Sequence, residues 1–79
     1  MNNLINTKVY HGSPYYENAE TIEEIYVEEN FPEHKTIQFE SGFFTRITHK
    51  DFQTFLKDGW VRYVRNFPDG KALESMSLA

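Results

Sequence analysis

The sequence predicts an α+β fold, in which a small antiparallel sheet of three to four strands carries one short helix packed on it. Short segments of alternating apolar and polar residues lie between turn-forming residues, as strands do. One segment, about residues 49–58, instead has helical spacing and helix signals at both ends. The chain of 79 residues is expected to form a single small domain, because it is too short to bury a second core.

The N-terminal half contains one clear strand and one ambiguous segment. Residues 8–11 alternate and precede a Gly-Ser-Pro sequence, which predicts a short strand ending in a turn. Within residues 21–29, Ile22 and Ile25 have the spacing of a helix face, but these residues and Tyr26 are also strand formers. Helix and strand both remain open here, with a slight preference for strand.

The central part predicts a hairpin followed by the helix. Residues 35–39 and 43–48 are two alternating segments, and the three-residue connection between them ends in Gly42. Thr48 suits the N-cap position, and Gly59 suits the left-handed position after the last helical turn. The stripe expected to pack on the sheet consists of Phe52, Phe55 and Leu56.

The C-terminal part predicts one further strand and a tail. Residues 60–67 alternate with apolar side chains on both faces, and Trp60 is placed to pack on Phe55 beyond the helix end. Residues 67–70 have a type I turn pattern. Residues 71–79 are expected to be a frayed tail with at most one helical turn.

Charge is divided unevenly along the chain. The formal net charge is −4, but residues 1–34 carry −6 and residues 35–79 carry +2. This distribution does not suit broad binding to nucleic acid or to anionic membranes, so neither is expected as a partner. The chain has no cysteine, no leader-like start and no long apolar run, which predicts no membrane insertion and a cytoplasmic location.

No catalytic or metal-binding pattern is complete. The three histidines, at positions 11, 34 and 49, lie far apart without ligand spacing, and no nucleophile motif is present. We therefore expect no enzyme activity, no cofactor and no metal. Arg46, Arg62 and Arg65 are expected to cover aromatic rings rather than to form a nucleic-acid patch.

One local sequence suggests a different chemistry. Tyr10-His11-Gly12-Ser13 lies at the end of the predicted strand and resembles the first NAD-binding motif of ADP-ribosyltransferases of the diphtheria-toxin and PARP type. That resemblance implies that His11 and Gly12 hold the nicotinamide ribose and amide. The later tyrosine strand and catalytic glutamate of that family have no counterpart here, so a strand ending in a turn is the preferred interpretation.

The strongest remaining signal is a run of seven glutamates between residues 17 and 33, without a basic residue among them. One interpretation is a solvated surface that keeps an aromatic-rich domain soluble. The other is a recognition surface in which carboxylates beside large rings fit a basic, partly apolar patch on another protein. The candidate partner-binding residues are Tyr15, Tyr16, Glu20, Glu23, Glu24, Tyr26, Glu28 and Phe31.

In size and composition, this tiny, acidic, aromatic-rich chain resembles the small early host-takeover proteins of bacteriophages, with which it shares no motif. The resemblance implies a non-catalytic protein that binds and blocks one host bacterial protein, in cell division, transcription, replication, nucleoid or protease machinery. The alternatives are a DNA-mimic inhibitor, a structural subunit of an assembly, and a minimal NAD-linked fragment around His11. The identity of the partner and the oligomeric state remain open.

Overall fold

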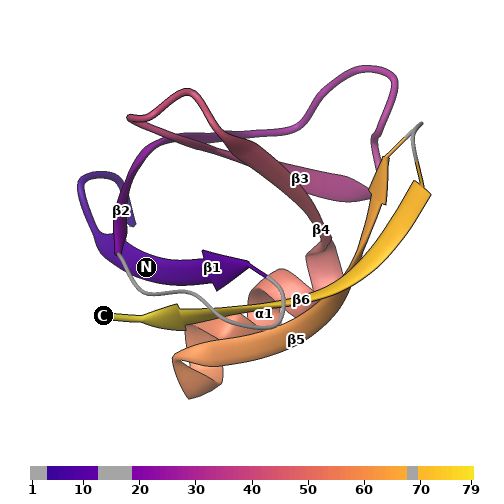
Figure 1. Ribbon diagram of the computed structural model, residues 1–79. Helices are drawn as coiled ribbons and strands as arrows, with labels where there is room; N and C mark the ends of the chain where they lie inside the picture. The colour runs from indigo at the N-terminus through magenta and orange to yellow at the C-terminus, as the bar shows by residue number, and fades with distance from the viewer. Residues whose placement is uncertain (1–3, 13–18, 68–69) are drawn as a thin grey trace.

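Six antiparallel strands form one sheet in the order β4-β3-β2-β1-β6-β5 (Figure 1). The computed structural model describes residues 4–12, 19–67 and 70–79. The class is α+β, as predicted, but the expected three to four strands understate the sheet. The elements are β1 (Lys8–Gly12), β2 (Glu20–Tyr26), β3 (His34–Phe39), β4 (Phe44–Thr48), α1 (His49–Asp58), β5 (Trp60–Phe67) and β6 (Gly70–Leu78).

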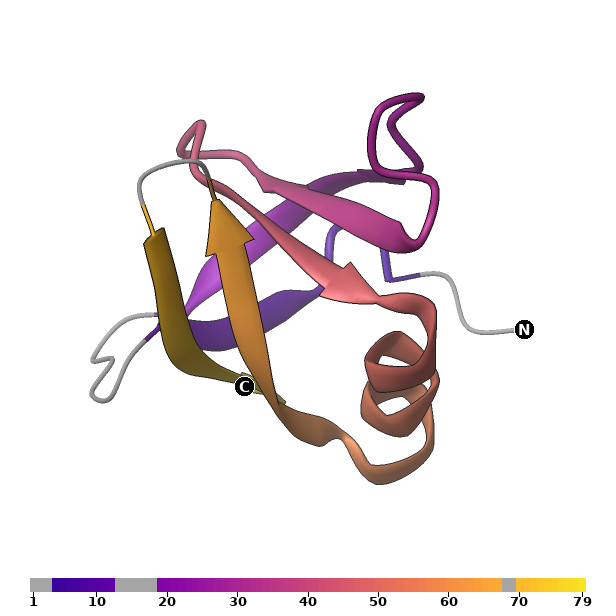
Figure 2. The ribbon, with the colours of Figure 1, turned by 90° about the vertical axis from the view of Figure 1, so that its right-hand side faces the viewer.

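The sheet curls, so that its two edge strands approach each other (Figures 1 and 2). Side chains connect these edges: the hydroxyl groups of Thr45 on β4 and Tyr63 on β5 lie 2.9 Å apart. The helix α1 links the same two strands and packs against both of them. The inner face of the curl holds the core. Its fully buried apolar residues are Val9, Ile22, Ile37, Phe39 and Met76, with Ile47 and Phe55 almost as deeply buried.

The predicted helix and its caps are confirmed. The Thr48 hydroxyl accepts a hydrogen bond from the backbone N–H of Asp51 at 3.1 Å. Gly59 has a left-handed backbone with φ 81°, and its N–H donates to the Phe55 carbonyl at 2.8 Å. This is the single bond of the αL motif rather than the Schellman pair of bonds. Trp60 remains 56% exposed, so the helix end does not bury it as expected.

The hairpin of β3 and β4 is also confirmed. Its register runs from His34 opposite Thr48 to Gln38 opposite Phe44. Gly42 in the connection has φ 94°, a left-handed conformation that glycine adopts without steric cost. Within the described residues, the structure contains no helix with the length and apolarity that crossing a membrane requires.

The ambiguous segment forms the strand β2, and a β-bulge explains its helix-like pattern. Ile22 lies opposite Phe39 and Ile25 lies opposite Ile37, so three steps along β2 match two steps along β3. The register shift makes Glu23 the additional residue. Both isoleucines therefore face the core at a spacing that a helix face would also produce.

The C-terminal segment differs from the expected frayed tail, because it forms β6 between β1 and β5. Met76 pairs with His11 on one side and with Val61 on the other. The strand pattern is obscured because the inward set includes Glu74 and the outward set includes Leu73. Alanine, leucine, glutamate and methionine are also good helix formers. The predicted turn at 67–70 falls partly on residues 68–69, which lie outside the described residues.

Candidate functional site

Two cross-strand rows form the outer surface of β2, β3 and β4. Residues opposite each other in neighbouring strands share a face of the sheet. The first row contains Glu24, Gln38 and Phe44, and the second contains Tyr26, Thr36 and Arg46. Glu23 and Glu24 are exposed, and Tyr26 and Phe44 are each 38% exposed. We call Glu23, Glu24, Tyr26, Glu28, Phe31 and Phe44 the acidic–aromatic surface.

Arg46 anchors the connection between β2 and β3 onto this surface. Its guanidinium carbon lies 3.8 Å from the centre of the Phe31 ring and 5.1 Å from that of Phe44. Its Nε donates a hydrogen bond of 2.6 Å to Glu28, and the Thr36 hydroxyl donates one of the same length to the same oxygen. Because these residues cover it, Arg46 is only 8% exposed although it lies on the outer face.

The acidic residues of the surface therefore differ in how strongly they are paired within the chain. The hydrogen bond from Arg46 lowers the pKa of Glu28, the bond from Thr36 and the charge of Arg46 lower it further, and burial opposes them. Glu28 thus stays ionised and paired. By contrast, Glu23 makes one long contact, accepting from Gln38 at 3.4 Å, and Tyr26 donates to the same Gln38 at 3.4 Å. Glu23 and Glu24 are the carboxylates that a partner can reach.

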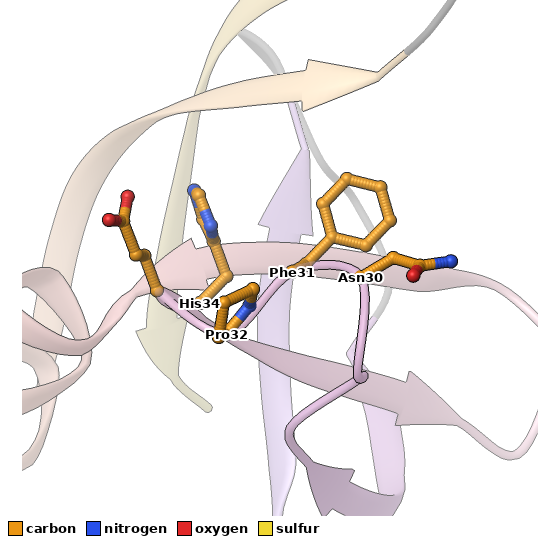
Figure 3. Close-up of a pocket in the computed structure, with 5 residues that line it drawn as sticks. Asn30, Phe31, Pro32 and His34 are labelled. Carbon is orange, nitrogen blue, oxygen red and sulfur yellow. The ribbon is translucent and has the colours of Figure 1, made fainter.

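A shallow pocket of about 290 Å³ lies in the β2–β3 connection. It is lined by Asn30, Phe31, Pro32, Glu33 and His34. In Figure 3 the side chains of Phe31 and His34 project to the same side of the chain. The Nε2–H of His49 donates to the Pro32 carbonyl at 2.8 Å, which ties the connection to the start of α1. The pocket adjoins the acidic–aromatic surface through Phe31, which belongs to both.

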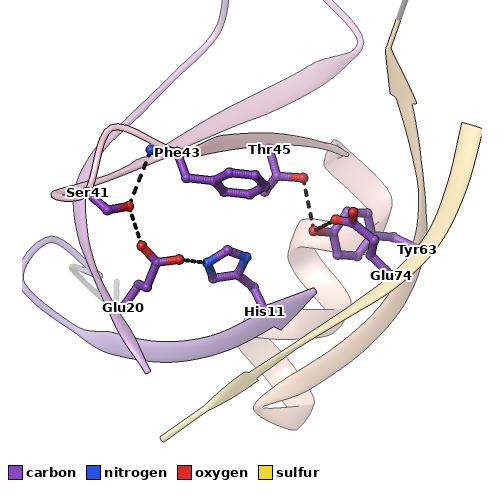
Figure 4. Close-up of polar contacts among 7 residues, drawn as sticks. All are labelled: His11, Glu20, Ser41, Phe43, Thr45, Tyr63 and Glu74. Carbon is purple, nitrogen blue, oxygen red and sulfur yellow. Dashed lines mark hydrogen bonds and ion pairs between the residues drawn. The ribbon is translucent and has the colours of Figure 1, made fainter. Parts of the chain in front are cut away.

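A second polar cluster lies on the inner face (Figure 4). One carboxylate oxygen of Glu20 is hydrogen-bonded to His11 Nε2, and the other accepts from the Ser41 hydroxyl. The His11 ring stacks on Phe39 and on Phe43, with ring centres 4.2 and 4.9 Å away. Burial raises the pKa of Glu20, but the hydrogen bonds from Ser41 and His11 and the charge of His11 lower it more.

This cluster contains a serine, a histidine and a carboxylate, but not in a catalytic order. A catalytic triad needs the serine hydroxyl on one imidazole nitrogen and the carboxylate on the other. Here Glu20 lies between Ser41 and His11, and His11 Nδ1 is buried without a hydrogen-bond partner among the described residues. The cluster therefore lacks the order of a catalytic triad, and its hydrogen bonds join β1 to β2 and β2 to the β3–β4 connection.

A neighbouring network occupies the same inner face. The Tyr63 hydroxyl donates to Glu74 at 3.2 Å, so its oxygen accepts the bond from Thr45. All three side chains are buried. The network joins β4, β5 and β6 across the point where the sheet edges meet.

The structure separates the residues that the sequence suggested for partner binding. Glu23, Glu24 and Tyr26 are exposed together, while Glu28 and Phe31 are held by Arg46. Glu20 points to the inner face, and Tyr15 and Tyr16 lie outside the described residues. Phe44 was absent from the suggested set, although its alternation with Thr45 places it on the outer face and could have identified it.

The described residues contain no group of three or more histidine, aspartate or glutamate side chains arranged to hold a metal ion. Comparisons of the chain with protein-family models, with curated proteins and with solved structures found no match.

Proposed function

We propose that this chain is a non-catalytic binding protein whose acidic–aromatic surface docks on a basic, partly apolar surface of a host bacterial protein and blocks it. One observation carries the proposal. The exposed carboxylates of Glu23 and Glu24 lie beside the half-exposed rings of Tyr26 and Phe44 on a hydrogen-bonded sheet. Large rings supply contact area at interfaces, and complementary charge selects the partner and its orientation.

The surface is also held in place before binding. Tyr26 and Phe44 project from paired strands, and Arg46 fixes Phe31 against the same sheet. An ordered surface loses little conformational entropy when a partner covers it. This supports docking by a preformed surface rather than folding of the segment on binding.

The same geometry weighs against two alternatives. A DNA mimic needs an extended array of free carboxylates, but Glu20 and Glu28 are each paired within the chain. An NAD site around His11 needs an accessible imidazole, but this side chain is only 7% exposed and is hydrogen-bonded to Glu20.

The proposal is tested by affinity capture from bacterial lysate, followed by titration of the captured protein, once purified, with variants of this chain. We expect Tyr26→Ala and the pair Glu23→Lys/Glu24→Lys each to weaken binding at least about tenfold, which corresponds to about 1.4 kcal/mol. The matched control is Glu40→Lys/Asp58→Lys, which makes the same charge change at exposed positions outside the surface. Circular dichroism would verify that each variant is folded. Unchanged affinity in both surface variants would refute the assignment.

A further inference from the structure

The other half of the curled sheet has an outer surface of opposite character. Alternation places one set of side chains from β1, β6 and β5 outward, opposite the buried Val9, Met76 and Val61. The cross-strand rows are Tyr10, Ser77 and Trp60; Ser75 and Arg62; and Leu73 and Val64. Lys8 and Lys71 are exposed at positions in the same alternating sets. We call these nine residues the basic–apolar surface.

Its apolar side chains include the most exposed large hydrophobic residues of the described part of the chain. Trp60, Val64 and Leu73 are 56%, 54% and 53% exposed, and Val64 lies directly opposite Leu73. Aliphatic and aromatic groups that remain together in water mark an interaction surface. Because two of the three are aliphatic, they suit a protein partner better than nucleic acid, which would use stacking rings.

The charge of this surface is uniformly positive among the described outward residues. Lys8, Arg62 and Lys71 are all exposed. Glu74, the one acidic residue in these three strands, is buried on the inner face and bonded to Tyr63. A surface that combines exposed basic and apolar side chains is the kind of patch that the acidic–aromatic surface is proposed to recognise.

The two surfaces cannot meet within one molecule. Figure 1 shows β3 and β4 on one side of the curl, β1, β6 and β5 on the other, and β2 between them. Both surfaces lie on the outside of this one curled sheet, so neither can cover the other. We propose that a second copy of this chain covers the basic–apolar surface with its own acidic–aromatic surface. The inference rests on the binding role proposed above for the acidic–aromatic surface, and charge complementarity between the two surfaces selects this occupant.

Such a contact is heterologous, because the two copies contribute different surfaces. The two copies of a bound pair together still present one free surface of each kind, so association continues into open chains or closes into a ring. Every copy that binds another through its acidic–aromatic surface has that surface occupied. Self-association therefore competes with binding of the host protein, and salt weakens it because exposed charges contribute to it.

The test uses sedimentation velocity of the nuclease-treated full chain, from about 10 µM to about 1 mM, the range that a weak contact requires. Variant one, Glu23→Gln/Glu24→Gln, keeps only the basic–apolar surface. Variant two, Arg62→Gln/Lys71→Gln, keeps only the acidic–aromatic surface. The natural chain should gain mass with concentration at 50 mM NaCl and less so at 500 mM. Each variant alone should stay monomeric.

An equimolar mixture of the two variants should form a heterodimer and no larger species, because only one complementary pair of surfaces remains. Trp60 is the single tryptophan of the chain. Adding Trp60→Phe to variant two leaves tryptophan emission from variant one alone, and covering its surface should shift that emission to shorter wavelength. Thermal melts of both variants establish that they are folded.

Three outcomes would overturn the inference. A natural chain that stays monomeric throughout refutes it. If Glu23→Lys/Glu24→Lys nevertheless weakens binding of the host protein at least about tenfold, the proposed function stands. Dimerisation of variant one alone would mean that two basic–apolar surfaces pair with each other. Association of the natural chain without heterodimer formation in the mixture would place the contact elsewhere.

Discussion

Replacing Arg46 by methionine tests whether this side chain anchors the β2–β3 connection. The substitution keeps a long apolar side chain, so it retains much of the packing on Phe31 and Phe44. It removes the hydrogen bond to Glu28 and the guanidinium charge over the rings. The difference in stability therefore reports on the polar contacts rather than on lost volume.

The size of the effect follows from those contacts. A hydrogen bond to a charged group contributes about 1.5–3 kcal/mol. The Glu28 side chain is 29% exposed, so solvent screening reduces its bond to about 1 kcal/mol. A cation over a ring at 3.8 Å adds about 0.5–1 kcal/mol. The expected loss of about 1.5–2 kcal/mol is a large part of the roughly 4–12 kcal/mol available to a domain of this length.

Urea denaturation followed by circular dichroism at neutral pH measures this loss. For a domain of this size, 2 kcal/mol also lowers the melting temperature by about 8–16 °C. The matched control is Arg62→Met, which makes the same substitution at an exposed arginine of β5 and should change stability by less than about 0.5 kcal/mol. A double-mutant cycle that adds Glu28→Gln to the natural chain and to Arg46→Met isolates the interaction free energy between Arg46 and Glu28.

An Arg46→Met variant as stable as the natural chain would show that the polar contacts of Arg46 do not anchor the β2–β3 connection. That result would mean that desolvation of the guanidinium cancels its contacts and that an apolar residue serves equally well. It would also remove the argument that Phe31 is fixed before binding.

Three further measurements examine other parts of the fold. Because the folded-state pKa values of Glu20 and Glu28 lie below the ordinary value near 4.5, both stabilise the fold above that pH and lose this contribution as the pH falls through the lowered values. The urea midpoint should therefore drop on acidification from about pH 5, and less steeply in Glu20→Gln and Glu28→Gln variants. Thr48→Ala should cost about 1 kcal/mol in a thermal melt through loss of the helix cap, and an unchanged melt would dismiss the cap. Deleting Glu23 should leave a folded protein with a regular β2–β3 ladder, whereas deleting Gln38 should unfold it; amide NMR spectra distinguish the two results.

The elements that could be predicted from the sequence depend on local signals. The helix α1 has a cap residue at one end, a left-handed glycine at the other and an apolar stripe between them, all within about a dozen residues. The β3–β4 hairpin likewise depends on alternation around one turn. In both, the residues that decide the structure are neighbours in the chain.

The elements that could not be predicted depend on distant partners. Ile22 and Ile25 both face inward only because β3 accommodates a bulge beside them. β6 buries Glu74, which becomes compatible with the core when Tyr63 from another strand bonds to it. Neither arrangement is visible before the register of the sheet is known.

The candidate surface could likewise be predicted only where neighbouring residues in the chain define it. Glu23, Glu24 and Tyr26 could be recognised as acidic and aromatic neighbours whichever element they formed. Glu20 turns inward because it pairs with Val9, whose side chain faces the core. His11 lies two residues after Val9 on β1, so it shares that inner face and can bond to Glu20. Sequence spacing alone could not separate the paired glutamates from the free ones.

The strands β4 and β5 lie side by side without forming a backbone hydrogen-bond ladder with each other. These strands are the two ends of the sheet order, and the hydrogen bond described between them joins side chains, Thr45 and Tyr63. We therefore expect β4 and β5 to separate locally while all five strand pairings stay intact. Amide hydrogens on the facing edges of β4 and β5 should exchange with solvent well before those of β6, which is paired on both sides.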